Sequence, residues 1–196
     1  MRDIVLGGLT VIIFVISFVG GFFGYHQYQS YTYDDLLKKS DSNWVQAKDN
    51  LSQVNITKNS YDTNIKYIKN AINLTDEAIN QTQQMVNNAP DNETYAYAQI
   101  RLTQYQNARS MEEYLLKLIE DIKTNGIFVA IAFFQDNTED INNIGLNIAA
   151  EQNQLIQVVN SNPSLNQRLV NVLGQDRVNG ILKDVPEQGN GTGAIN

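Results

Sequence analysis

Hydrophobic residues are distributed along this chain in two patterns, one continuous and one periodic. The continuous pattern runs from Ile4 to Phe23, twenty residues without a charge, and about 20 apolar residues in a helix cross a hydrocarbon core about 30 Å thick. The sequence therefore predicts a transmembrane helix over residues 4–24, behind a short leader of residues 1–3. A cleaved signal peptide is the alternative, but its apolar region usually has only about 7–15 residues.

Small residues and tyrosines mark the end of this segment and the residues that follow it. Small residues four apart let two membrane helices approach closely, and they predict a packing face at Ser17, Gly20, Gly21 and Gly24. Tyrosine rings settle at the level of the lipid headgroups. Residues 25–34 therefore predict an interfacial belt, anchored by Tyr25, Tyr28, Tyr31 and Tyr33.

The periodic pattern is a heptad repeat from Leu37 to Ala89. Twelve of its sixteen inward positions are apolar, Trp44 and Leu51 among them, whereas the outward positions are mostly polar. A period of seven predicts helices that pack with a gentle left-handed twist. One continuous helix up to residue 89 would be about 130 Å long at 1.5 Å per residue, and a bend near Thr57–Ser60 would shorten it.

The remaining residues predict further helices and no strand. Proline, which breaks a helix interior, occurs only at positions 90, 163 and 186, and no run alternates with period two. Asp91 predicts a helix start and Gly126 a helix end. Pro163 predicts the first turn of a last helical region, with an interruption at Gly174.

The expected fold class is therefore all-α. A single N-terminal transmembrane helix continues into the long heptad-patterned helix, and an antiparallel bundle of three or four helices occupies residues 35–185. The tail, residues 186–196, has little to bury and is expected to be mobile.

A second apolar block covers residues 126–134, and nine residues are too few to span a bilayer. Because the block has no polar face, buried core is one interpretation; an interface with a partner and a tip that dips into a membrane are the others. If the first helix stands straight, a return helix from residue 92 brings the block beside Trp44. On that geometry we expect Phe128, Phe133 and Phe134 to pack against Trp44 and against a neighbouring subunit.

Composition narrows the chemistry that the chain can perform. It has 14 basic and 21 acidic residues, a net charge of -7, no cysteine and one histidine. Nucleic-acid binding needs clustered Lys and Arg, so no nucleic-acid partner is expected. Without cysteine there is no thiolate metal site or cysteine nucleophile, and His26, in the belt, is too far from the domain for a Ser/His/Asp set. We expect no catalytic residue, no cofactor and no metal site.

Five Asn-x-Thr sequences predict N-linked glycosylation, at Asn55, Asn73, Asn80, Asn92 and Asn190. Asn73 and Asn80 fall on outward positions of the heptads, where sugars would not disturb packing. These acceptors favour a bundle outside the cell and a cytoplasmic N-terminus, although the basic residues on the two sides of the span do not decide its orientation. A glycoprotein without cysteine fits an archaeal cell better than a eukaryotic one.

Together these features favour a non-catalytic, membrane-anchored subunit of a membrane or cell-surface assembly that acts through helical packing. Its expected partners are membrane lipid and other membrane or surface proteins, further copies of itself included. The alternative is an extracytoplasmic helical bundle that binds a small ligand as a sensor. A leader of three residues offers such a sensor no cytoplasmic output domain.

Overall fold

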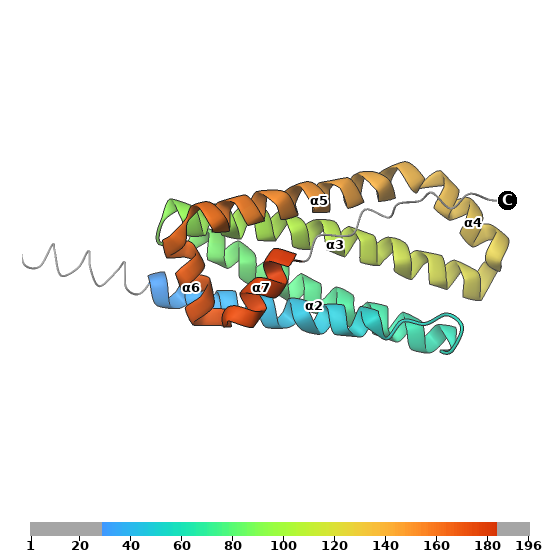
Figure 1. Ribbon diagram of the computed structural model, residues 1–196. Coiled ribbons are helices and arrows are strands. Elements are labelled where there is room, and N and C mark those ends of the chain that lie inside the picture. The colour runs from blue at the N-terminus through green and yellow to red at the C-terminus, as the bar shows by residue number, and fades with distance from the viewer. Residues whose placement is uncertain (1–28, 184–196) are drawn as a thin grey trace, which may run out of the picture.

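The computed structural model describes residues 29–183, and these form seven helices and no strand (Figure 1). The first helical stretch covers residues 29–52. The helices that follow are α2 (Tyr61–Asn87), α3 (Asn92–Asn125), α4 (Ile127–Asp136), α5 (Thr138–Ser161), α6 (Pro163–Leu173) and α7 (Gln175–Lys183). The all-α prediction is confirmed for this part of the chain.

None of the helices between residues 29 and 183 is both long and apolar enough to cross a membrane. The predicted transmembrane helix of residues 4–24 lies outside the described residues. So do the predicted tail and six of the predicted site residues, which are Ser17, Gly20, Gly21, Gly24, Tyr25 and Tyr28, together with the acceptor Asn190. These assignments stay predictions.

The heptad segment forms a hairpin, so the prediction of one continuous helix is wrong. Residues 29–52 and α2 run antiparallel on the two sides of a turn at residues 53–60 (Figure 1). Asn43 of the first arm donates hydrogen bonds to Glu77 and Gln81 of the second, at 3.1 and 3.2 Å. The inward face that the heptads predict is nevertheless confirmed in both arms, because Leu37 and Ile68 are buried.

Polar side chains hold the turn between the two arms. Asn64 is fully buried, and its side chain accepts from the backbone N–H of Asn55 at 2.9 Å and donates to its carbonyl at 3.2 Å. Ser60 caps α2 by accepting from the N–H of Thr63. These bonds satisfy backbone groups that a helix start leaves without partners, which stabilises a turn in a segment without glycine or proline.

Helices α3 and α5 complete a bundle of four long helices. Asp91 caps α3 as predicted, since its carboxylate accepts from the N–H of Thr94 at 2.8 Å and the Thr94 side chain binds back to the N–H of Asp91. On the buried side, Gln104 of α3 donates to Gln152 of α5 at 2.9 Å. The predicted end of this helix at Gly126 is also confirmed.

Helices α6 and α7 form a short hairpin that lies across the first helix (Figure 1). Gly174 breaks the region where the sequence predicts it, with φ at 89°, a conformation that favours glycine. Arg168 of α6 pairs with Asp34 at 2.7 Å. Arg177 of α7 makes two bonds of 2.7 Å to the carboxylate of Asp41, so both short helices are fixed to residues 29–52 by charged hydrogen bonds.

The interior contains two apolar clusters with polar residues between them. The larger cluster lies near residue 29 and contains Tyr33, Leu36, Leu37, Met85, Tyr97, Ala98, Leu155, Val159, Leu165, Leu169, Val178 and Ile181. The smaller cluster contains Ile68, Ile72 and Ile119. The buried polar residues include Asp41, Arg101, Gln104, Glu112 and Gln152. Such groups must be hydrogen-bonded to be tolerated, and most of these are.

Tyr33 belongs to this interior, so its prediction as an interfacial anchor is wrong. It has no exposed surface, its hydroxyl donates to the carbonyl of Thr94 at 3.0 Å, and the Arg168 guanidinium lies 5.2 Å from its ring centre. Burial raises the pKa of Tyr33 well above its usual value. Tyr31, in contrast, is 77% exposed, and its anchoring role stays a prediction.

Candidate interaction site at helix α4

Helix α4 is the second apolar block of the sequence, and the structure exposes it. Phe128 is 83% exposed and Ile127 58%, while Phe134 and Ile131 are each 46% exposed and Val129 45%. Only Ala130 of this helix is buried. The interpretation of the block as buried core is therefore wrong for the structure between residues 29 and 183.

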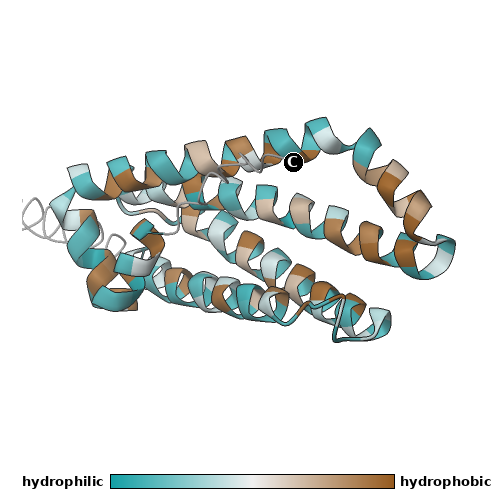
Figure 2. Cartoon of the chain, turned by 45° about the vertical axis from the view of Figure 1, so that its right-hand side comes forward, coloured by the Kyte–Doolittle hydropathy of each residue, from teal (hydrophilic) through white to brown (hydrophobic). Residues whose placement is uncertain are grey.

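The apolar side chains of α4 form the main concentration of this kind on the described surface. Ten large hydrophobic side chains are exposed between residues 29 and 183, and five of them belong to α4. The other five are spread over the first helix, the 53–60 turn, α2, α3 and α5. Figure 2 shows the same contrast, because hydrophobic and hydrophilic residues alternate along the long helices but α4 is mostly hydrophobic. Contiguous apolar surface of this kind marks interaction sites.

Glycine 126 sets the direction in which α4 leaves the bundle. Gly126 has a φ of 86° and a ψ of 168°, a backbone conformation in which only glycine is unstrained. It is the single residue between the end of α3 and the start of α4. Helix α4 then turns back over the end of α3 and joins α5 (Figure 1). The end of the bundle that carries α4 is opposite to the end at which residue 29 enters (Figure 1). At 1.5 Å per residue, the 34 residues of α3, which runs from one end to the other, separate the two ends by about 50 Å.

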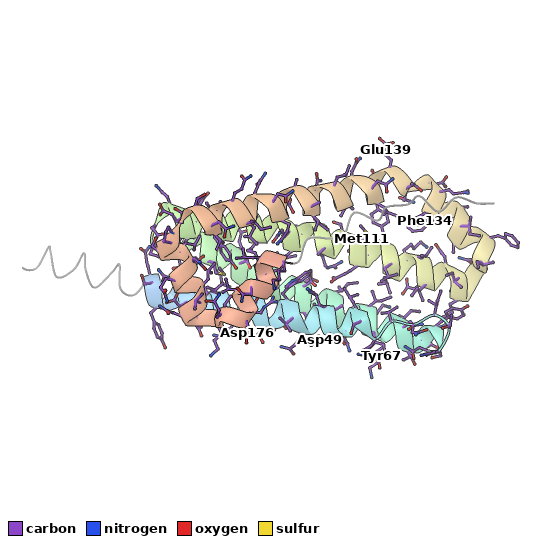
Figure 3. The ribbon with its side chains drawn as sticks, in the orientation of Figure 1. Asp49, Tyr67, Met111, Phe134, Glu139 and Asp176 are labelled. Atoms are coloured by element: carbon purple, nitrogen blue, oxygen red, sulfur yellow. The ribbon has the colours of Figure 1, made fainter. Side chains whose placement is uncertain are left out.

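The expected packing of the block on Trp44 is wrong. The Trp44 ring lies against Tyr105 of α3, with the ring centres 5.0 Å apart. Phe133, which is half-buried, lies against Tyr114 of the same helix at 6.1 Å. Nine residues separate the two tyrosines, about 13 Å along a helix, so α4 and Trp44 contact α3 at different levels. Figure 3 labels Phe134, which lies where α4 meets α5.

A cleft of about 500 Å³ lies beside α4, between α3 and α5. Phe133 and Tyr114 form its aromatic wall, and the rest of the lining is mostly polar, with Ser110, Glu113, Lys117, Asp140, Asn143, Ile144 and Asn147. The Tyr114 hydroxyl donates to Asp140 at 3.3 Å. An apolar helix next to a cleft with polar groups resembles the general plan of an interface, with an apolar centre and a polar rim.

Acidic residues border α4 where α5 begins. Asp136, Glu139 and Asp140 form no ion pair with any residue of the described part of the chain, and Glu139 projects outward from α5 (Figure 3). Glu139 and Asp140 stabilise the first turn of α5 through the helix dipole. The acidic rim also creates a negative potential at the edge of the apolar surface.

The interior also holds a carboxyl group to which the sequence analysis assigned no role. Glu112 of α3 is only 3% exposed, and its Oε1 accepts from the Thr75 hydroxyl of α2 at 2.8 Å. Its Oε2 is buried without a hydrogen-bond partner among the described residues. Burial raises the pKa of Glu112 to about 7. The residue also lines a pocket of about 160 Å³, otherwise walled by Leu51, Ala108, Met111, Leu115 and Ile148.

Sequence reasoning located α4 but not the residues around it. Tyr114 and Asp140 are brought to the site by the antiparallel pairing of α3 and α5, and Glu112 by the pairing of α2 with α3. No local pattern signals such long-range pairs. The described residues contain no group of three or more His, Asp or Glu side chains arranged to hold a metal ion.

Comparisons with known proteins found no matching family model, no matching curated protein and no matching solved structure.

Proposed function

We propose that this protein is a membrane-anchored, non-catalytic subunit that presents α4 to a partner protein at the far end of its helical bundle. The exposure of α4 carries this proposal. A helix with five large apolar side chains in water is unfavourable by about 25 cal/mol per Å², and a partner surface would remove that cost. The uncharged segment Ile4–Phe23 supports the anchor.

Two observations favour a protein over a lipid surface as the occupant of α4. The acidic rim of Asp136, Glu139 and Asp140 would be repelled by anionic lipid headgroups. The predicted anchor also precedes residue 29, which is at the opposite end of the bundle from α4 (Figure 1). The partner that fits is a protein with an apolar groove flanked by Lys or Arg residues, because that combination complements both the helix and its rim.

The size of the surface indicates a contact that depends on the anchor. A helix of ten residues is about 15 Å long, and one such face covers less than the roughly 800 Å² per partner of a typical stable interface. Anchoring both proteins in one membrane would raise their effective concentration and compensate for the small area. The adjacent cleft would enlarge the contact further.

Site-specific photo-crosslinking in native membranes tests the proposal. A photoreactive phenylalanine analogue replaces Phe128 in the full-length protein, and in the control it replaces Leu146 of α5, which is 64% exposed. We expect Phe128 to form an adduct with another protein, mapped to an apolar peptide flanked by basic residues, and Leu146 not to form it. Charge reversal at Glu139 and Asp140 should reduce the yield severalfold.

Other outcomes of that experiment would contradict the proposal. Equal adducts at the two positions would mean that α4 is not a specific contact. Adducts with lipid alone would assign α4 to a membrane, and adducts with a second copy of this chain would assign it to self-association.

A second candidate function is a helical bundle that binds a small ligand. The pocket beside Glu112 supports it, because apolar walls with one polar group are typical of ligand sites. Its volume of about 160 Å³ suits only a small molecule. Addition of small alkylamines or arylamines to the full-length protein in detergent should then raise its thermal midpoint, and Leu115→Trp, which fills the pocket, should abolish the increase.

A further inference from the structure

The four Asn-x-Thr acceptors in the described part of the chain differ in how they present their threonine. Transfer of a glycan requires both the asparagine amide and the hydroxyl residue two positions later. Asn73 and Asn80 are exposed on α2, but their threonines, Thr75 and Thr82, have no exposed surface. In a helix, residues i and i+2 do not face the same side. An enzyme therefore cannot reach both members of either pair while α2 is folded.

The threonine hydroxyls of these acceptors also have partners inside the bundle. Thr75 donates to Glu112 at 2.8 Å, and Thr82 donates to the carbonyl of Ala78 at 2.7 Å. The acceptor at Asn92 is similar, because Thr94 is 1% exposed and its side chain bonds to Asp91 in the cap of α3. Exposing any of these threonines would break its buried hydrogen bond. It would also unfold the helix turn or helix end that contains the threonine.

The acceptor at Asn55 has the opposite arrangement. It lies in the 53–60 turn, outside the helices, and Thr57 is exposed. The Asn55 Oδ1 accepts from the Thr57 hydroxyl at 2.8 Å and from the N–H groups of Thr57 and Lys58 at 3.0 and 3.1 Å. The asparagine and the threonine of this acceptor are therefore already side by side on one accessible surface.

We propose that Asn55 is the acceptor of an N-linked glycan on the folded domain, and that Asn73, Asn80 and Asn92 are not modified once the bundle has formed. The donor is a lipid-linked oligosaccharide. The Asn55 Nδ2 forms a bond to the anomeric carbon of the first sugar and loses one proton, while the bond from that carbon to the lipid phosphate breaks. The lipid phosphate group leaves.

This modification would have a consequence for α4. The 53–60 turn lies at the same end of the bundle as α4 (Figure 1). A hydrophilic glycan at this end would keep unrelated apolar surfaces away from α4 while leaving the side formed by α3 and α5 open. The inference does not depend on the proposed function, since it rests on the geometry of the acceptors alone.

An in vitro transfer reaction tests the inference. The full-length protein, with Asn190→Gln to remove the fifth acceptor, is purified in mild detergent and incubated with a single-subunit oligosaccharyltransferase and its lipid-linked oligosaccharide. Site occupancy is followed by peptide mass spectrometry. We expect Asn55 to be modified at least tenfold faster than Asn73, Asn80 or Asn92, and we expect this preference to disappear when the chain is first unfolded in urea.

Matched variants separate the local geometry from an effect on folding. Thr57→Val should abolish modification of Asn55, and Thr57→Ser should retain it, with unchanged helical circular dichroism in both. Modification of Asn73 or Asn80 in the folded protein at the rate of Asn55 would overturn the inference. So would a folded protein in which Asn55 is not modified.

Discussion

Replacement of Glu112 by Gln gives the most quantitative prediction from this structure. The Glu112 carboxyl is buried, and burial raises its pKa from 4.5 to about 7; the Thr75 hydrogen bond and the Arg109 charge oppose this, and Asp76 and Glu113 add to it. Gln has nearly the same shape and keeps an oxygen acceptor for Thr75. The substitution therefore removes the ionisable group and leaves the bond from α2 in place.

The sign of the pH dependence follows from proton linkage. The folded state binds the Glu112 proton more tightly than the unfolded chain, so the stability that the protonated carboxyl provides is present below pH 4.5. It is lost as the pH rises to about 7. At about 1.4 kcal/mol per pKa unit, this loss is on the order of 3 kcal/mol. Relative to the wild type, Glu112→Gln should become more stable by that amount between pH 4 and pH 8.

Urea unfolding of the full-length protein in detergent measures this effect. The single tryptophan, Trp44, reports on the packing of the first helix against α3 through its contact with Tyr105. Glu113→Gln is the matched control, because Glu113 is the exposed neighbour of Glu112 and should change the free energy of unfolding by less than about 1 kcal/mol at either pH. If the difference between Glu112→Gln and wild type is the same at pH 4 and pH 8, the carboxyl does not titrate in the folded protein as we argue.

Two further predictions concern the backbone and the anchor. Gly126→Ala should destabilise the protein by about 1–3 kcal/mol in urea unfolding, because the φ of 86° strains any other residue; the control Gly145→Ala, within α5 and with open space around it, should be neutral or slightly stabilising. Deletion of residues 1–28 should release the protein from carbonate-washed membranes into the soluble fraction, and recovery of the full-length chain in that fraction would refute the anchor.

The heptads predicted which face of each helix is buried, but they offered the turn near Thr57–Ser60 only as an alternative to one continuous helix. Leu37 and Ile68 point inward as expected, because each arm covers its own apolar stripe against the same interior. The turn between them depends on Asn64, nine residues from Asn55 in the sequence, and on a serine cap. The only mark of this turn in the heptads is Lys58 at an inward position, and no glycine or proline accompanies it, so periodicity alone did not decide between a bend and a continuous helix.

The sequence did not predict which individual residues are buried near the ends of the segments. Tyr31 and Tyr33 are the same type of residue and both follow the apolar run, yet Tyr31 is exposed and Tyr33 is fully buried. What separates them is Arg168 and Thr94, which contact Tyr33 from α6 and α3. Contacts between residues so far apart in sequence are decided by the packing of the whole bundle, and no local signal contains them.

The apolar block that forms α4 also shows what the sequence pattern could not predict. Its lack of a polar face made burial in the core one of three interpretations, and the structure leaves five of its side chains exposed. The reason is its position: Gly126 directs α4 over the end of α3, where the first helix and α2 have already turned away. In the part of the chain from residue 29 to residue 183, the other helices leave these side chains exposed. The sequence pattern therefore located an apolar segment, but it did not decide between burial in the core and the other interpretations of the block.

The fold also sets the distance between α4 and the end of the bundle at which residue 29 lies. A straight helix from residue 35 to residue 89 would extend about 80 Å, whereas the 34 residues of α3 place the α4 end of the bundle about 50 Å from the end at which residue 29 lies. Two arms and two further long helices, side by side, bend less than one isolated helix, so α4 keeps a defined distance and direction from the start of the bundle. A partner bound to α4 would be held in one orientation relative to the bundle. That property would suit the subunit proposed above, which presents α4 to a partner protein at the far end of the bundle.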